Sequence, residues 1–493
     1  MTVDIARRAG LGELVRRSAA RTPDSIAVVF GDRTWTYAQL LEAAEGAAGA
    51  LGVSPGDRVA VLGRNSDTYL ITWLATQLAG AIHVPVNFML NAREVAYIVE
   101  HSGAALALAD EELFERLPSS RRAQTLTDFE ASWGRHAFTD PDIASTDVAQ
   151  IAYTSGTESA PKGAMLTHEG LLAQYVSCIV AGEYAATDVM LHALPLYHCA
   201  QMHCFIMPGL YLGAQNIILP APAPDAVFGA VQTYGATSFF APPTVWIGLL
   251  QDERCNAVEL RTLTKGYYGA SIMPVQTVRD LSERLPGLRL WNYYGQTELG
   301  PLATYLAPDE QLTKPGSAGK PVLNVTTRVV DEEMRDVAVG EVGEVVHRSP
   351  QVTAGYYNDP ERTEAAFAGG WFHSGDQATV DADGYLTIVD RKKDMINSGG
   401  ENVSSREVEE VLYRHPAVAE VAVVGIPDDR WIEAVCAVVV AREAVEPDEL
   451  RAFAREDLAP FKVPKSVVFV DELPKNPSGK ILKRELRAQT SSS

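Results

Sequence analysis

Apolar and polar residues along the first third of the chain alternate between helical and strand-like periods. An Ala- and Leu-rich segment at residues 38–51 predicts a helix, and the apolar run 58–62, which follows a turn at 54–57, predicts a short buried strand. A helical pattern returns at 68–79 and a strand-like pattern at 81–85. Alternation of this kind indicates an α/β fold in which helices cover layered sheets.

The pattern changes near residue 390. A short charged group, Arg391-Lys392-Lys393-Asp394, follows the strand-like segment 385–389. Beyond it, shorter elements succeed one another: helical patterns at 405–414 and 447–456, and strand-like patterns at 418–426, 434–440 and 466–470. Roughly 100 residues can form an independent domain. We therefore place a domain boundary at the charged group and predict a small α+β domain after it.

Composition and charge narrow the classes of function. The 493 residues are 46% hydrophobic and carry a formal net charge of −21. This acidity argues against binding along a nucleic-acid backbone, which needs a basic surface, but leaves room for a local nucleotide site. The five cysteines show no CxxC spacing, so we expect neither a disulfide framework nor a zinc site. Because no apolar run approaches the roughly 20 residues of a membrane span, and residues 1–10 lack a signal-peptide core, we expect a cytoplasmic protein.

The strongest chemical signal begins where the apolar segment 149–153 ends. Residues 154–163 read Thr-Ser-Gly-Thr-Glu-Ser-Ala-Pro-Lys-Gly. A strand that opens into Ser, Thr and Gly residues presents backbone N–H groups and hydroxyls to an anion, and glycine lets the backbone approach closely. Lys162 adds a positive charge suited to phosphate. The segment lacks the GxxxxGK[ST] spacing of the Walker phosphate loop.

This segment resembles the phosphate loop of the adenylate-forming superfamily, which contains acyl- and aryl-CoA synthetases, adenylation domains of peptide synthetases and beetle luciferases. Glu158 and Ser159 stand where the commoner form has Thr and Gly. Segments that resemble four further motifs of the superfamily follow in the same order, at 293–298, 371–376, 391–402 and 474–481. The resemblance covers nearly the whole chain and is closest to fatty acyl-CoA synthetases.

The resemblance implies which residues bind ATP and Mg²⁺. Thr297 would contact the α-phosphate, Glu298 and Thr157 would hold Mg²⁺, and Asp376 would accept hydrogen bonds from the ribose hydroxyls. A tyrosine of the 293–298 motif would pack on adenine, as suits an aromatic face. The residues expected around the nucleotide are Thr154, Ser155, Gly156, Thr157, Lys162, Gly269, Ala270, Ser271, Asn292, Tyr293, Tyr294, Gly295, Asp376 and Arg391.

The resemblance also implies a two-step reaction. In the first step the acid would attack the α-phosphorus of ATP, while Lys480 bridges the carboxylate and the α-phosphate. The small domain would then rotate about Lys393, which removes Lys480 and brings Gly399 and Gly400 to line a tunnel for the thiol. The implied organisation is an AMP-binding and acyl-pocket domain at 1–391, a hinge at 392–393 and a mobile C-terminal domain at 394–493.

The segment 194–198 is expected to line the acid pocket. His198 would lie at its mouth as a fourth catalytic residue beside Lys480, Glu298 and Thr297, although a structural histidine is the alternative. The apolar segments 239–247 and 266–271 contain no Arg or Lys. A buried carboxylate on a dicarboxylic acid would lack a partner there. We therefore favour a medium- or long-chain fatty acid, with an aromatic acid second, and expect Tyr268 to shorten the acyl tunnel.

Other readings stay open. The thiol could belong to coenzyme A or to the phosphopantetheine of an acyl carrier protein, and the protein could be a monomer or a homodimer. An oxidative, luciferase-like reaction is a further possibility. A silent binding protein would not need Lys162, Glu298, Asp376, Arg391 and Lys480, all of which are present.

Overall fold

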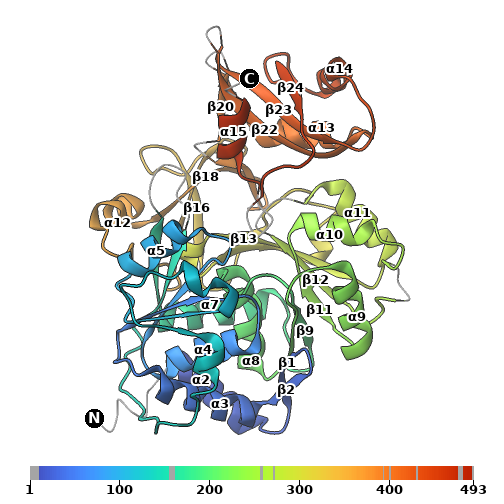
Figure 1. Cartoon of the computed structure of the whole chain (residues 1–493). Coiled ribbons are helices and arrows are strands. Elements are labelled where there is room, and N and C mark those ends of the chain that lie inside the picture. Colours follow the sequence, from blue (N-terminus) through green and yellow to red (C-terminus); the bar gives the residue numbers. More distant parts are fainter. Residues whose placement is uncertain are drawn as a thin grey trace.

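The chain folds into a large domain with a smaller domain beside it (Figure 1). This computed structural model describes residues 10–154, 161–255, 259–269, 273–391, 394–398, 401–428, 431–475 and 481–490. The large domain contains sheets of nine, six and four strands, and the C-terminal domain contains one sheet of its own. The predicted α/β fold with a small α+β C-terminal domain is confirmed. No helix among the described residues has the length and apolar character to cross a membrane.

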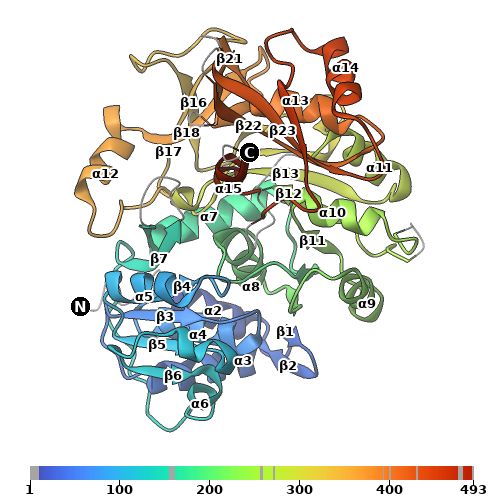
Figure 2. The ribbon, with the colours of Figure 1, turned by 45° about the horizontal axis from the view of Figure 1, so that its top comes forward.

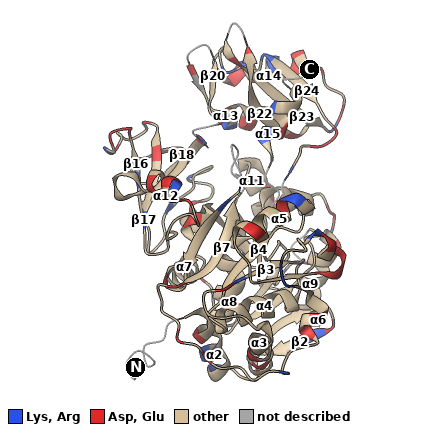
Figure 3. Ribbon diagram, turned by 60° about the vertical axis from the view of Figure 1, so that its left-hand side comes forward, with Lys and Arg blue, Asp and Glu red and all other residues tan. Residues whose placement is uncertain are grey.

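The six-stranded sheet has the order β6-β5-β3-β4-β7-β8 and is parallel except for its last pair. Its strands are β3 (Arg58–Leu62), β4 (Ile82–Val86), β5 (Leu106–Ala109), β6 (Ala123–Thr125), β7 (Val148–Thr154) and β8 (Lys162–Thr167). The helices beside it are α2 (Leu11–Arg21), α3 (Tyr37–Leu51), α4 (Asp67–Leu78), α5 (Ala92–His101) and α6 (Leu126–Glu130). The predicted helices and strands of this region are thus confirmed to within a residue or so. Few charged residues lie on these strands, which suits a sheet covered by helices (Figure 3).

The nine-stranded sheet is parallel through its centre, from β1 to β13. In spatial order its strands are β15 (Lys320–Pro321), β14 (Leu302–Leu306), β13 (Arg289–Gly295), β12 (Lys265–Gly269), β11 (Ser238–Phe240), β9 (Val189–His192), β10 (Gln215–Ile218), β1 (Ile26–Phe30) and β2 (Arg33–Thr36). The helices that follow its strands are α9 (Pro224–Tyr234), α10 (Pro243–Leu250) and α11 (Val275–Arg284).

Two helices run between the large sheets (Figure 2), and a π-helix leads into one of them. The helix α7 (His168–Ala181) contacts both β8 of one sheet and β14 of the other. The π-helix η2 (Ala200–Ile206) continues into α8 (Met207–Leu212), which contacts α7 and β10. The phosphate-loop strands β7 and β8 therefore face the nine-stranded sheet across this shared layer.

The chain leaves the large domain through an antiparallel sheet of four strands. These are β16 (Thr326–Val330), β17 (Gly343–Arg348), β18 (Phe372–Val380) and β19 (Leu386–Arg391), with α12 (Pro360–Ala366) between β17 and β18. The predicted hinge residues 392–393 lie outside the described residues, so the domain limits stay predictions.

The C-terminal domain has a hydrophobic core of its own. Its strands are β20 (Ile396–Ser398), β21 (Glu401–Val403), β22 (Val418–Asp428), β23 (Ile432–Ala441) and β24 (Ser466–Phe469), and its helices are α13 (Ser405–Tyr413), α14 (Pro447–Asp457) and α15 (Lys483–Thr490). The five elements predicted from 405 to 470 are all present. The short strands β20 and β21 and the helix α15 were not predicted.

A buried ion pair holds together the starting ends of the parallel strands. Lys265, at the start of β12, lies 2.7 Å and 3.0 Å from the two carboxylate oxygens of Asp188, which precedes β9. The two side chains are 15% and 8% exposed, and the lysine also donates to the Glu183 carbonyl at 2.6 Å.

We expect Lys265→Met to lower the free energy of unfolding by about 3 kcal/mol, because it leaves a buried carboxylate without its cation. Urea unfolding followed by tryptophan fluorescence measures this change. The control is Lys314→Met, whose partners Asp381 and Asp383 are 40% and 69% exposed, so that solvent screening should make its loss of stability much smaller. Equal losses in the two variants would contradict the role of the buried pair.

Candidate active site

Most of the predicted nucleotide residues in the described chain lie at strand ends. Thr154 ends β7, Gly269 ends β12, and Asn292 to Gly295 end β13. Parallel strands bring their carboxyl ends to the same edge of a sheet, where α/β proteins bind ligands. The close pairing of β12 and β13 requires glycine at 269, since a Cβ atom there would lie 2.5 Å from the Tyr293 carbonyl oxygen.

Lys162 and Glu298 meet in a compact buried cluster. Lys162 stands opposite Thr154 in the β7–β8 pair, and its Nζ lies 3.2 Å from Oε1 of Glu298. Glu298 lies in the 3-10 helix η3 (Thr297–Leu299), which follows β13, and the residue is only 7% exposed. Two residues predicted from motifs 136 positions apart therefore form one charge pair.

Tyr356 completes this cluster. Its hydroxyl accepts a hydrogen bond from Lys162 Nζ at 2.6 Å and donates one to Glu298 Oε1 at 2.9 Å. The ammonium group also lies 4.2 Å from the centre of the tyrosine ring. Burial, reinforced by the neighbouring Glu298 carboxylate, raises the pKa of Tyr356 well above its usual value. The hydroxyl therefore keeps its proton and stays a donor to Glu298.

The cluster fits a polyphosphate and a hard cation. Glu298 provides carboxylate oxygens of the kind that Mg²⁺ prefers, and Lys162 provides a point charge for phosphate. Within the described chain, the buried Oγ1 of Thr154 has no hydrogen-bond partner. Such a hydroxyl opposite Lys162 suits an oxyanion ligand. The partner expected for Glu298 at the metal, Thr157, lies outside the described residues.

The predicted ribose residue Asp376 lies on β18, paired with Arg391 on β19. Its Oδ2 accepts hydrogen bonds from the Tyr294 hydroxyl at 2.7 Å and from Gln296 Nε2 at 2.8 Å, and Arg391 Nε lies 3.3 Å from Oδ1. Asp376 is only 4% exposed, and the buried Oε1 of Gln296 has no partner within the described chain. The carboxylate is thus held in one orientation by neighbours from β13, the turn after it and β19.

The two tyrosines of the motif have different surroundings. Tyr293 is 6% exposed and packs among aromatic rings, with Phe205 and Tyr267 at centroid distances of 5.7 Å and 5.5 Å. Tyr294 is half-buried and reaches Asp376. Successive residues of a strand point to opposite faces, so Tyr294 and not Tyr293 shares a face with Asp376, and its contact with adenine stays a prediction. Asn292, which donates to the Ser317 carbonyl at 2.8 Å, is buried beneath the site.

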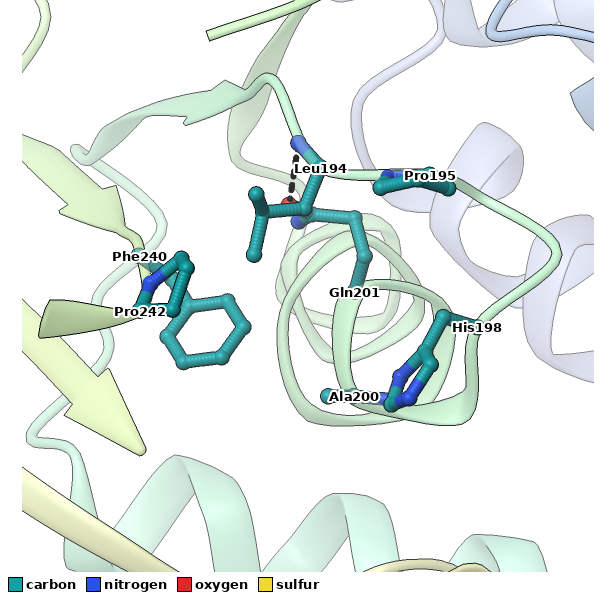
Figure 4. A pocket seen from close by; sticks show the side chains of 7 residues that line it. All are labelled: Leu194, Pro195, His198, Ala200, Gln201, Phe240 and Pro242. Atoms are coloured by element: carbon teal, nitrogen blue, oxygen red, sulfur yellow. Dashed lines mark hydrogen bonds between the residues drawn. The ribbon is translucent and has the colours of Figure 1, made fainter. Parts of the chain in front are cut away.

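A small pocket lies where the acid was expected (Figure 4). Its lining residues are Leu194, Pro195, His198, Ala200, Gln201, Phe240 and Pro242. Phe240 stacks on Phe205 with a centroid distance of 4.4 Å and an interplanar angle of 16°. His198 is half-buried at this pocket, and its Nδ1 accepts a hydrogen bond from the Ala200 N–H at 3.2 Å. Its role in catalysis stays a prediction.

Hydrogen bonds satisfy the polar groups behind the pocket. Gln201 accepts from the Leu194 N–H at 3.2 Å and contacts His192 Nδ1 at 2.8 Å, while His192 Nε2 contacts Asn216 at 2.9 Å. Burial lowers the pKa of His192 to about 4, so this histidine is neutral. Tyr268 packs in the neighbouring core and donates to Gln311 at 2.7 Å. It is not among the lining residues, and its effect on the acyl tunnel stays a prediction.

Several predicted residues lie outside the described residues, and other residues of the site were not predicted from the sequence. Those outside are Ser155, Gly156, Thr157, Ala270, Ser271, Lys393, Gly399, Gly400 and Lys480. Tyr356, Gln296 and Gln201 were missed. Gln296 was inside a recognised motif, whereas Tyr356 follows Glu298 by 58 residues and no local spacing links the two.

These features define an enzyme that adenylates a carboxylic acid. The chain belongs to the AMP-binding enzyme family: the family's main domain matches residues 15–357, and its C-terminal domain matches 407–480. Feruloyl-CoA synthase from an Amycolatopsis species is 39% identical over 98% of this chain and 99% of its own length. Indoleacetate–CoA ligase from Aromatoleum aromaticum is 34% identical over 97% of each.

A solved structure is similar to this chain over both of its domains. ATP-bound MatB from Rhodopseudomonas palustris superposes with a TM-score of 0.89 at 30% identity, covering 97% of this chain and 99% of MatB. The apo form of the same protein gives 0.77. The family assignment is thus confirmed, and the chain is an adenylate-forming acid–thiol ligase of the acyl-CoA synthetase type.

We expect Tyr356→Phe to lower kcat/KM for ATP in acid-dependent ATP–pyrophosphate exchange by roughly tenfold, since it removes a hydrogen bond to each of two charged groups. The matched control is Tyr357→Phe, which removes the hydroxyl of the next tyrosine, whose ring packs edge-on against His101 outside the cluster. That control should stay within about twofold of wild type. A similar loss in both variants would show that the bridge between Lys162 and Glu298 is irrelevant.

Proposed function

We propose that this enzyme joins an aromatic carboxylic acid to coenzyme A through an acyl-adenylate. The observation that carries the proposal is the near-full-length identity of 39% to a feruloyl-CoA synthase. An aromatic acid was the second choice from the sequence alone. A fatty acid remains the second candidate, because the pocket residues include no Arg or Lys and would also accept an alkyl chain.

The walls of the pocket favour a flat ring. Pro195 and Pro242 lie beside it, and proline fixes its own φ angle. Phe240 is held by its stack on Phe205. A rigid, planar acid loses little conformational entropy on entering such a site, whereas a flexible chain loses more. Aromatic rings also pack favourably against other rings and apolar side chains.

In the first step, a carboxylate oxygen of the acid forms a bond to the α-phosphorus of ATP, and the bond to pyrophosphate breaks. Lys162 would neutralise charge on the departing pyrophosphate, and Thr297 would hold the α-phosphate. Mg²⁺, when held by Glu298 and Thr157, would supply further charge neutralisation at the phosphates. Asp376 and Arg391 would orient the ribose, and the half-buried face of Tyr294 would support adenine. Lys480 would balance the charge of the entering carboxylate.

In the second step, the thiol sulfur attacks the acyl carbon and AMP leaves. We infer that Gly399 and Gly400 line the thiol path after the C-terminal domain has turned about Lys393. A single residue can absorb the backbone change of such a rotation. The acceptor could instead be a carrier-protein phosphopantetheine, which carries the same thiol arm.

A panel of acids tests the substrate class. We expect kcat/KM in ATP–pyrophosphate exchange to be at least about tenfold higher for hydroxycinnamic acids than for straight-chain acids, a ratio that differences in pocket packing can produce. The highest value for a medium- or long-chain fatty acid would favour the second candidate. A preference for malonate or acetate would contradict both. Thioester formation with CoA and with a holo carrier protein then identifies the acceptor.

The two half-reactions should separate in two variants. Lys480→Ala should reduce adenylate formation by roughly 10²–10³-fold, because it removes charge stabilisation in that transition state. It should largely spare thioester formation from a supplied adenylate. Lys393→Pro should do the reverse, since proline restricts the rotation. Equal loss of both half-reactions in both variants would refute the domain rotation.

A further inference from the structure

The residues on either side of the segment that carries Lys480 are paired with each other, and we call this pair of flanking stretches, 474–475 and 481–482, the base of the segment. Lys475 and Ile481, which flank residues 476–480, form an antiparallel bridge, and the Leu482 N–H donates to the Pro474 carbonyl at 2.8 Å. On the N-terminal side, the ammonium group of Lys475 lies 2.6 Å from the carboxylate of Glu420. On the C-terminal side, α15 begins at Lys483. The contacts of Lys483 therefore help to determine where this base lies.

Lys483 is a largely buried lysine with two partners on α13. Its Nζ donates to the Ser405 hydroxyl at 2.5 Å and lies 2.8 Å from Oε1 of Glu409. The two charged side chains are only 19% and 22% exposed, and Glu409 also accepts from the Val423 N–H at 2.7 Å. Burial alone lowers the pKa of Lys483, but the charges of Glu409 and Asp390 raise it above its usual value. The side chain is therefore a cation.

Ser405 links Lys483 to a residue of the large domain. Its hydroxyl donates to Oδ2 of Asp390 at 2.6 Å, and its N–H donates to the same oxygen at 2.9 Å. Ser405 is fully buried and Asp390 is 8% exposed. Asp390 is the penultimate residue of β19, two positions before the predicted hinge. Lys483, Glu409, Ser405 and Asp390, which we call the Lys483 network, connect the base of the Lys480 segment to the last strand of the large domain.

Neighbouring contacts show that the first turn of α13 is docked on β19. Ser404 Oγ donates to the Val389 carbonyl at 2.8 Å. Arg406 donates to the Ile388 carbonyl and, at 3.0 Å, to the carbonyl of Gly316 in the large domain. The TM-score of 0.89 to ATP-bound MatB, against 0.77 to its apo form, agrees with a domain arrangement suited to adenylation.

We propose that Lys483 is a positioning residue for the adenylation step. Through Ser405 it holds the base of the Lys480 segment against Asp390 at the hinge, and so fixes where Lys480 can reach. This inference rests on the proposed role of Lys480 in the first half-reaction. It predicts that cutting the network impairs adenylate formation selectively.

The decisive variant is Ser405→Ala, because it removes the hydroxyl that joins Lys483 to Asp390, while the Lys483–Glu409 pair and the bond from the N–H of residue 405 to Asp390 remain. We expect ATP–pyrophosphate exchange to fall by roughly tenfold, as for loss of a hydrogen bond from a neutral hydroxyl to a charged group. Thioester formation from a supplied acyl-adenylate should change by less than about threefold, because the network does not act in that step. Ser405→Thr, which keeps the hydroxyl, should restore exchange. Lys483→Met should show the same selectivity with a larger loss.

The matched control is Lys462→Met. Lys462 also pairs with a glutamate of α13, lying 2.7 Å from both oxygens of Glu407 with 24% of its side chain exposed, but its partner does not reach β19. This variant should leave both half-reactions unchanged. Thermal unfolding of each variant measures any loss of stability, and Ser405→Ala decides the outcome if Lys483→Met fails to fold.

Selective loss of exchange in Ser405→Ala, with rescue by threonine, supports the proposal. Equal loss of both half-reactions, loss of the second alone, or no loss at all overturns it. Lys480→Ala separates this result from the proposed function: if that variant keeps full exchange activity, the role of Lys480 itself is wrong. If it loses exchange while Ser405→Ala does not, only the positioning role is wrong.

Discussion

The charge pair between the buried Glu298 and the half-buried Lys162 is the constraint on which the rest of the site depends. Burying a carboxylate is costly unless a cation and hydrogen bonds compensate it. Here the compensation comes from β8 through Lys162 and from the segment before α12 through Tyr356. The Glu298 carbonyl also accepts from the Thr353 N–H at 2.6 Å. Glu298 therefore brings two segments that are distant in sequence, β8 and the stretch 353–356, to the edge where β13 ends.

The expected nucleotide site consists of two groups of residues near the edge of the nine-stranded sheet where β13 ends. Thr154, Lys162 and Glu298 would bind the phosphates, and Asp376 with Arg391 would bind the ribose. Gln296, between the two groups, donates to Asp376 from the turn that leads into Glu298. Because both groups are supported by the same short stretch after β13, a shift of that stretch would move both. The aromatic core around Tyr293 lies beneath it and limits such a shift.

Local patterns were enough to predict elements and charged residues, but not their partners. The strand at 58–62 and the helix at 38–51 follow from periodicity, and both are present as β3 and α3. The pairing of Lys162 with Glu298 could be expected only from the order of family motifs. Tyr356 escaped prediction because its contact joins segments 58 residues apart and arises from sheet packing. The helix α15 was missed because residues 483–490 are mostly polar, with only Leu486 fully buried. The identity of the acid depends on pocket shape, which periodicity does not report.

The separate core of the C-terminal domain has a consequence for how the protein melts. Apolar side chains of that domain pack with one another, whereas polar groups such as Ser404 and Arg406 make the contacts to β19 described above. When such a hydrogen bond is replaced by one to water, the net loss of free energy is modest. Exposing apolar side chains to water costs more, because burial of apolar surface is the main favourable term in folding. Heating need not unfold the chain in a single cooperative transition. We expect the small domain to be a second calorimetric unit, which loses its structure while the larger one keeps its own.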